Sequence, residues 1–201
     1  MVNFTNLRRN FLDYVRGALR GHPGVRLGRG VKLGGPGRYD LHRGVTITAG
    51  ARLWVGPGAT FTMMPGSKLG DRTIVNVETN VYIGRSTRVS WDVQILDTDF
   101  HWVRTPDGRV RPHTKPIALG DQVLVGSRAM ILKGVEVGDG AVIGAGSVVR
   151  RSVLPGVIVA GNPAQHVGEV VEWGSARGEI PADRSAATVA GEIRSDSAAE
   201  H

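Results

Sequence analysis

Aliphatic residues recur along this chain with a period of six. From residue 117 the sequence divides into the hexads IALGDQ, VLVGSR, AMILKG, VEVGDG, AVIGAG and SVVRRS, and the third residue of every hexad is aliphatic. Residues two apart on a β-strand point to the same side. The first and third residues of each hexad are therefore predicted to face one core. The same phase occurs upstream, in the pairs Val45/Ile47, Ala51/Leu53, Val75/Val77, Val81/Ile83, Thr87/Val89 and Val93/Ile95.

This period excludes the commoner architectures. Amphipathic helices repeat about every 3.6 residues, and the strands of a sandwich are spaced by about 8 to 12 residues. A short strand in every hexad instead predicts an all-β solenoid, in which each coil extends a continuous column of aliphatic side chains. Gly120, Gly126, Gly138 and Gly144 follow the large inward residue, and we expect them where the chain must turn.

The two ends of the chain differ from the repeat. Residues 3–20 carry apolar side chains at helical spacing with arginines between them, which predicts an amphipathic helix within residues 1–22. We expect this helix to cap the open end of the solenoid or, alternatively, to lie on a membrane surface. The solenoid domain is predicted to span residues 23–173. Residues 174–201 are small and polar, and we expect a flexible, mostly disordered tail.

Composition narrows the class of protein. The 201 residues include 29 glycines and no cysteine, which excludes a disulfide scaffold and a thiolate metal site. The sequence shows no apolar run long enough to span a membrane and no signal peptide, so we expect a cytoplasmic protein. The net charge is +7, but the basic residues form no dense block and aromatic residues make up only 5%. We therefore expect no nucleic-acid partner.

One segment interrupts the hexads. Residues 97–116, DTDFHWVRTPDGRVRPHTKP, replace the aliphatic period with charged and aromatic residues. Insertions in solenoids leave the coil as loops and often carry function. His101 is the main catalytic candidate, because an imidazole can take a proton from an attacking hydroxyl near neutral pH. Asp99 and Asp97 are candidates to hold its second ring nitrogen, and Trp102 either lines an acceptor site or anchors the loop.

The repeat and its continuation resemble a known family. The stretches ILKGVEVGDGAVIGAGSVV and VIVAGNPA are similar to the C-terminal half of the hexapeptide-repeat acyltransferases, and the resemblance covers roughly residues 25–168. It implies a left-handed parallel β-helix and a homotrimer with active sites between subunits. His101 stands where the sugar acetyltransferases of this family carry their catalytic histidine. The resemblance thus implies an acetyl-CoA-dependent O-acyltransferase of polysaccharide biosynthesis, acting on a hydroxyl of a sugar or glycan precursor.

The resemblance also implies where the acyl donor lies. Ser127, Gly144 and Ala145 match positions at which the family's coils approach acyl-CoA. Arg150 and Arg151 replace the family's usual Thr-Lys pair, and arginines there are expected to bind the 3′-phosphate of CoA. No metal is implied.

Two alternatives remain open on the sequence. An N-acetyltransferase acting on an amino sugar or nucleotide sugar would use the same histidine. A non-catalytic solenoid, serving as a scaffold or a membrane-associated assembly protein, would keep the fold without binding CoA, and the basic N-terminal helix is its best support. A γ-class carbonic anhydrase shares the solenoid but needs three histidines on a metal, and the surroundings of His101, His113 and His166 do not resemble that site.

Overall fold

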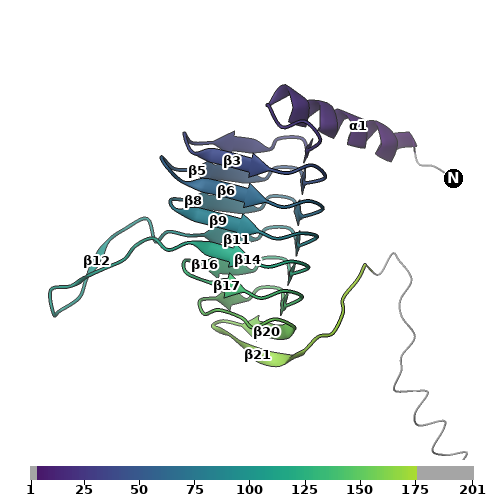
Figure 1. Ribbon diagram of the computed structural model, residues 1–201. Helices are drawn as coiled ribbons and strands as arrows, with labels where there is room; N and C mark the ends of the chain where they lie inside the picture. The colour runs from purple at the N-terminus through teal and green to yellow at the C-terminus, as the bar shows by residue number, and fades with distance from the viewer. Residues whose placement is uncertain (1–3, 176–201) are drawn as a thin grey trace, which may run out of the picture.

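The hexads fold into short parallel strands that wind into a left-handed β-helix of about seven turns, with one α-helix at its N-terminal end (Figure 1). This computed structural model describes residues 4–175. All but the first two residues of the tail predicted at 174–201 lie outside the described residues. Because every strand is only a few residues long, the fold is defined by the stacking of coils rather than by long strands.

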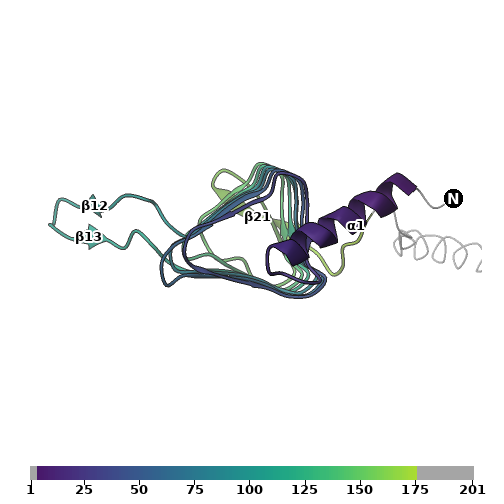
Figure 2. The ribbon, with the colours of Figure 1, turned by 90° about the horizontal axis from the view of Figure 1, so that it is seen from above.

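The strands form three parallel sheets along the sides of a triangular cross-section (Figure 2). Sheet A contains β1 (Arg26–Leu27), β4 (Thr46–Ile47), β7 (Lys68–Leu69), β10 (Arg88–Val89), β15 (Leu124–Val125), β18 (Val142–Ile143), β20 (Val157–Gly161) and β21 (Ala164–Glu169). Sheet B contains β2 (Lys32–Gly34), β5 (Arg52–Val55), β8 (Ile74–Val77), β11 (Gln94–Leu96), β16 (Met130–Leu132) and β19 (Val148–Val149). Sheet C contains β3 (Arg38–Leu41), β6 (Thr60–Met63), β9 (Asn80–Ile83), β14 (Ile117–Leu119) and β17 (Glu136–Val137). At the C-terminal end β21 turns back and pairs antiparallel with β20.

The predicted inward residues form the core. The third residues of the six hexads from residue 117 are at most 3% exposed: Leu119, Val125, Ile131, Val137, Ile143 and Val149. Polar residues at inward positions are buried as well, and their hydroxyls are satisfied. Thr87 donates a hydrogen bond to the carbonyl of Gly120 at 2.6 Å, and Ser67 donates one to the carbonyl of Met64 at 2.6 Å. The register predicted from the hexads is confirmed.

The glycines that follow the large inward residues have a different role from the one predicted. None of the four has a positive φ. A Cβ on Gly126 would lie 2.5 Å from the backbone nitrogen of Ala145 in the next coil, far inside van der Waals contact. The left-handed conformation occurs two residues later, at Arg128 (φ 61°) and, one coil on, at Gly146 (φ 69°). These glycines are therefore required by the close approach of consecutive coils and not by the turn itself.

Helix α1 (Phe4–Leu19) lies across the first coil (Figure 2). It contacts the coil through small and polar residues: Asp13 is 8% exposed, and Gly17 lies against the carbonyl of Val25. The guanidinium of Arg26 donates a hydrogen bond to the side chain of Asn10. Apolar side chains of the helix face outward, with exposed fractions of 66% for Phe11, 40% for Leu12, 43% for Tyr14, 37% for Val15 and 82% for Leu19.

The helix therefore covers the end of the solenoid as predicted, but with its polar face. The aliphatic column of the first coil is already closed by Val25 and Leu27, both 0% exposed. What the edge coil lacks is hydrogen-bond donors for its backbone, and Arg20, just after the helix, donates one to the carbonyl of Val31 at 2.7 Å. Among the described residues, no helix is long and apolar enough to cross a membrane.

Residues 97–116, the arm, leave the coil between β11 and β14 at the corner of sheets B and C (Figure 1). Its limbs pair as an antiparallel hairpin of β12 (Val103–Arg104) and β13 (Val110–Arg111). At the tip, hydrogen bonds from the Thr105 hydroxyl and the Arg109 guanidinium hold the pKa of Asp107 below its usual value. Val103 and Val110 are 52% and 47% exposed, so the arm packs little against its own chain.

Candidate functional site

The predicted site residues lie at two corners of the triangle. The arm corner, between sheets B and C, carries His101 and the rest of the arm. The Ser127 corner, between sheets A and B, is the column of turns that contains Trp91, Ser127 and Ala145 in successive coils. This stacking follows from two hydrogen bonds, from the Arg128 amide to the carbonyl of Trp91 at 3.0 Å and from the Gly146 amide to the carbonyl of Ser127 at 2.8 Å.

His101 lies exposed at the base of the arm. The chain is fixed immediately before it, where the Phe100 amide donates to the Thr98 hydroxyl at 3.0 Å and the Asp99 amide donates to the carbonyl of His113 at 2.8 Å. Within residues 4–175 no hydrogen bond engages the imidazole ring itself. The backbone thus holds the histidine in place and leaves its ring available to a substrate.

The two candidate acids have different environments. Asp97 is fully buried, and its oxygens accept hydrogen bonds from the amides of Glu78 and Thr79, both at 2.7 Å, and from the Thr79 hydroxyl at 2.8 Å. Asp97 therefore holds the corner of the preceding coil, and no described hydrogen bond joins it to His101, so a role in orienting His101 stays a prediction. Asp99 is 49% exposed and stays a candidate for that role.

Lys133 was missed by the sequence reasoning. Its ammonium group pairs with Asp99 at 2.5 Å on the outgoing limb of the arm and donates to the carbonyl of Pro112 on the returning limb. Lys133 stands in the turn after β16, directly below the base of the arm in register. One side chain thus joins both limbs of the arm to the next coil. Only the stacking of coils brings it there, since the arm separates the two in sequence.

Trp102 does not anchor the arm. The indole is 66% exposed, and its described partner is the guanidinium of Arg104, 6.0 Å from the ring centroid. Of the two alternatives left open by the sequence, this exposure favours a residue that lines an acceptor site. Within residues 4–175 no group of three or more His, Asp or Glu side chains is arranged to hold a metal ion.

Two backbone amides at the Ser127 corner lack the hydrogen-bond acceptor that equivalent amides have at some other turns. At one other turn of this corner Asp71 of the next coil accepts the amide hydrogen of Ala49, and at the corner between sheets C and A Asp121 accepts from Arg85 and Asp139 from Asp121. Ser127 and Ala145 face no aspartate in the coil that follows, and no described hydrogen bond uses either amide. Ala145 is exposed and Ser127 half-buried. These two donors therefore have no described acceptor, and such amides are suited to the carbonyls of a pantetheine chain.

The structure divides the residues predicted to bind CoA between the two corners. Gly144 and Ala145 lie at the Ser127 corner, where a Cβ on Gly144 would come within 2.9 Å of the Ala160 side chain. Arg150 and Arg151 follow β19, are exposed, and belong to the arm corner, one coil beyond Lys133. Within one chain the arginine pair and the Ser127 corner flank sheet B from opposite sides.

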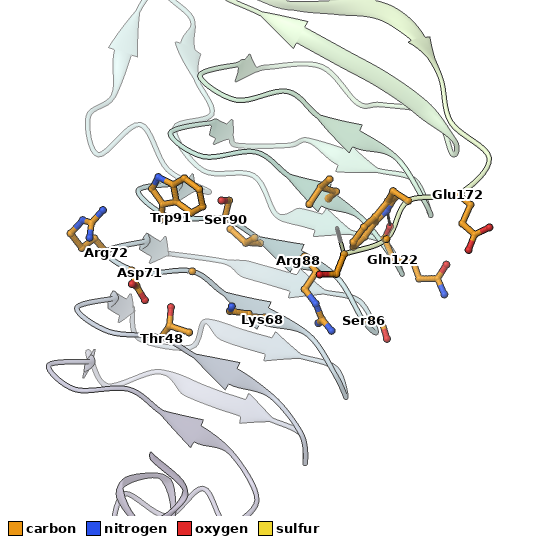
Figure 3. Close-up of a pocket in the computed structure, with 16 residues that line it drawn as sticks. Thr48, Lys68, Asp71, Arg72, Ser86, Arg88, Ser90, Trp91, Gln122 and Glu172 are labelled. Carbon is orange, nitrogen blue, oxygen red and sulfur yellow. Dashed lines mark hydrogen bonds between the residues drawn. The ribbon is translucent and has the colours of Figure 1, made fainter. Parts of the chain in front are cut away.

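A groove of about 930 Å³ lies on the outer face of sheet A, and the sequence reasoning did not find it (Figure 3). Strands β4, β7, β10 and β15 form its floor, and residues 172–175 form one wall, held by a 2.6 Å hydrogen bond from the Trp173 indole to the carbonyl of Gln122. Lys68 and Arg88 project from the floor. Lys68 and Arg88 both occupy the second position of their hexads, so the sequence could have predicted that they are neighbours. It gave no indication that Trp173 comes back to this face.

The repeat has a counterpart among known protein families. Residues 116–151 match the family described as the hexapeptide repeat of succinyl-transferase. The matched segment covers the hexads after the arm, and the same register continues upstream in the structure to residue 25. Residues 116–151 therefore carry the hexapeptide repeat of this family.

Curated relatives of this chain are acetyltransferases. It is 32% identical over 127 residues to the serine acetyltransferase of Mycobacterium tuberculosis, a span that is 60% of this chain and 54% of that protein. It is 41% identical over 71 residues to the 2,3,4,5-tetrahydropyridine-2,6-dicarboxylate N-acetyltransferase of Staphylococcus aureus, or 35% of this chain and 30% of that protein. The chain therefore spans about half the length of the first relative and less than a third of the second.

Solved structures share the fold at low sequence identity. The polysialic acid O-acetyltransferase OatWY matches with a TM-score of 0.69 and 21% identity, and the polySia-specific acetyltransferase NeuO with 0.62 and 23%; each match covers 84% of this chain and 83% of the other. AntD, an N-acyltransferase from Bacillus cereus in complex with dTDP-4-amino-4,6-dideoxyglucose and coenzyme A, matches with 0.57 and 16% over 86% of this chain and 87% of that one. At these identities the likeness concerns the fold alone.

The contrast between Asp97 and Asp99 gives a stability prediction. In Asp97→Asn an NH₂ group replaces one acceptor oxygen opposite buried amides, and we expect a loss of about 2 to 4 kcal/mol in the free energy of unfolding. In the matched control Asp99→Asn, which removes only an exposed ion pair, we expect a loss within about 1 kcal/mol. Denaturant unfolding at one protein concentration measures both, and equal losses would contradict the structural role of Asp97.

Proposed function

We propose that this protein is an acyl-CoA-dependent acyltransferase, with acetyl-CoA as donor, that acylates a hydroxyl of a sugar or glycan precursor. The observation that carries the proposal is an accessible histidine on the arm together with two uncapped amides at the Ser127 corner. The first group suits proton removal and the second suits a pantetheine chain. Relatives with acetyltransferase names support the reaction class, and the O-acetyltransferase neighbours support a hydroxyl acceptor.

The proposed reaction takes place in a ternary complex. The acceptor hydroxyl attacks the thioester carbonyl while His101 takes its proton, so that a C–O bond forms and the imidazole becomes imidazolium. Collapse of the tetrahedral intermediate breaks the C–S bond, and the leaving thiolate takes the proton from the imidazolium. The products are the ester and free CoA, and the histidine is neutral again. Asp99 is the proposed partner that stabilises the imidazolium while Lys133 holds the arm.

The proposed active site lies between chains. Its two halves are at opposite edges of sheet B. The outer face of this sheet is polar in part, with Lys32, Arg52, Asn76 and Gln94, but it also presents apolar side chains: Trp54 is 49% exposed, and Leu96, Met130, Leu132 and Val148 are half-buried. If the sheet B faces of three copies surround a threefold axis, the arm corner of one chain meets the Ser127 corner of the next. Arg150 and Arg151 then reach the bound CoA from the chain that supplies His101. A trimer is therefore part of the proposal.

The first test is acyl transfer itself. The protein is incubated with acetyl-CoA and a panel of sugars, amino sugars and nucleotide sugars, and acceptor-dependent release of CoA is followed. His101→Ala is expected to lower kcat/KM by about 10² or more, the usual scale for loss of a general base.

His113→Ala is the matched control, because the backbone carbonyl that His113 supplies to Asp99 survives the substitution. Turnover unchanged in His101→Ala would contradict the mechanism. Transfer to amino sugars alone would replace the O-acyltransferase by an N-acetyltransferase. If the protein neither binds CoA nor releases it with any acceptor, the result would support a non-catalytic scaffold.

The shared site predicts complementation between two inactive variants. His101→Ala removes one half-site, and Ala145→Trp fills the other. In randomly mixed trimers each mixed ring contains one intact site, so co-expression in equal amounts should restore roughly one quarter of the wild-type activity. Mixing the two purified variants without exchange of subunits is the control. No recovery on co-expression, with mixed trimers demonstrated by two affinity tags, would place both half-sites in one chain.

We also propose that α1 attaches the protein to an anionic lipid surface. Five large apolar side chains of the helix are at least 37% exposed. The helix has no acidic residue in its first turn, and its one acid, Asp13, is paired with Arg16. Arg8 and Arg9 add positive charge beside the apolar face, which is the pattern of a helix that lies in a membrane interface.

Vesicle flotation tests this attachment. Wild type is expected to float with phosphatidylcholine vesicles that contain phosphatidylglycerol and to remain in solution with pure phosphatidylcholine. Phe11→Ser combined with Leu19→Ser should lower the floated fraction at least about fivefold, whereas Val171→Ser, a substitution at an equally exposed apolar residue elsewhere, should not. Absence of flotation, together with a smaller oligomer in the double variant, would show that the helix packs against a second copy instead.

A further inference from the structure

The groove on sheet A carries two adjacent positive charges, an arrangement that is unfavourable when no anion is near. Lys68 and Arg88 are partners in register on adjacent strands, so their side chains leave the same face about 4.8 Å apart along the stack. Like charges opposite one another on neighbouring strands destabilise a sheet. Among the described ion pairs none involves either residue, and Arg88 donates only to the carbonyl of Gly66.

Two carboxylates near Lys68 and Arg88 already bind other groups, and a third forms no described ion pair with them. At the rim, Arg72 makes two 2.8 Å hydrogen bonds to Asp92, and this contact lowers the pKa of that carboxyl. Asp71 accepts the amide of Ala49 at 3.0 Å. Glu172 lies in the wall and forms no described ion pair with the floor. The positive charge of Lys68 and Arg88 therefore faces the open groove.

The remaining lining is suited to a saccharide. Trp91 is 53% exposed at the end of the groove beside the Ser127 corner (Figure 3), and Trp173 belongs to the wall formed by residues 172–175. The lining also carries hydroxyl and amide groups, from Thr48, Ser86, Ser90 and Gln122. Aromatic faces with hydrogen-bonding groups beside them match the alternating apolar and hydroxyl surfaces of a sugar ring. A volume of about 930 Å³ is at the upper end of the range for small-molecule sites.

The position of the groove relates it to the proposed transferase. Trp91 occupies the Ser127 corner one coil before Ser127. An acyl-CoA that lies along Ser127 and Ala145 toward the preceding coil brings its thioester to the Trp91 end of the groove. In the proposed trimer the arm of the neighbouring chain reaches the same end. A ligand in the groove therefore has a hydroxyl within reach of both reacting groups.

From these observations we infer that the groove is the acceptor site and that the acceptor is an acidic sugar, bearing a carboxylate or a phosphate held by Lys68 and Arg88. The inference rests on the proposed function for its catalytic part, whereas binding of the acidic sugar stands on the groove alone. Arg88 supplies the directional contact to the anion and Lys68 a point charge. The uncharged part of the ring lies against the indoles.

Binding and turnover are measured separately to test this inference. Calorimetric titration without acyl-CoA compares glucuronate and glucose 6-phosphate with glucose, so that the carboxylate and the phosphate are distinguished. We expect at least one acidic sugar to bind about tenfold or more tightly than glucose. Lys68→Gln with Arg88→Gln should abolish that preference and raise KM for the acidic acceptor by the same factor, with KM for acetyl-CoA unchanged. Arg38→Gln, at an exposed arginine on sheet C, is the matched control.

Each outcome separates the two ideas. A preference for the acidic sugar without any acyl transfer would support the groove and overturn the proposed function. Transfer to neutral sugars that ignores Lys68 and Arg88 would support the function and overturn the inference. Inorganic phosphate that binds as tightly as the sugar acids would overturn the saccharide part, since the groove would then recognise the anion alone. An equal effect in the Arg38 control would also overturn it, because the effect would then follow net charge.

Discussion

The close stacking of one coil on the next is the constraint on which the rest of this structure depends. Backbone hydrogen bonds join every turn to its neighbour, and the distance between coils leaves no room for a Cβ where Gly126 faces Ala145. Because of this contact, a given position of the hexad is repeated above itself in every coil. Side chains far apart in sequence thus become vertical neighbours. The core, the corners and the faces of the triangle are columns of this kind.

The corners show how such a column acquires a function. At some turns the column satisfies itself, because an aspartate of one coil accepts an amide of the coil before, as Asp71 does for Ala49. At Ser127 and Ala145 small residues stand where an aspartate would cap, and the amides are left for another partner. Asp97 has the same role, because it accepts hydrogen bonds from two amides of the preceding coil at the point where the arm leaves the solenoid. A change in one residue type along a column therefore separates turns with capped amides from turns with uncapped amides.

Charge follows the same geometry. A repeat places like residues above one another, so a basic residue at an outward position meets its equivalent in the next coil, as Lys68 meets Arg88. Where carboxylates balance the column, as Asp92 does for Arg72, the arrangement is structural. Where they do not, the like charges stay adjacent without a described carboxylate partner. At the arm, a lysine of the next coil has its carboxylate partner. Lys133 contacts both limbs of the arm and so fixes the base that carries His101.

The sequence by itself determined the period, the inward residues and the place where the arm leaves, because hydrophobic burial acts on each hexad locally and a strand alternates its faces with period two. The hand of the coil came from resemblance, since periodicity is the same for either hand. Only the tertiary structure decided which residues share a corner. It separated His101 from Ala145, assigned Asp97 to a buried cap, and turned the apolar face of α1 outward. These outcomes depend on which coils and edges meet in space, and that contact is set by stacking over the whole solenoid rather than by any local stretch of chain.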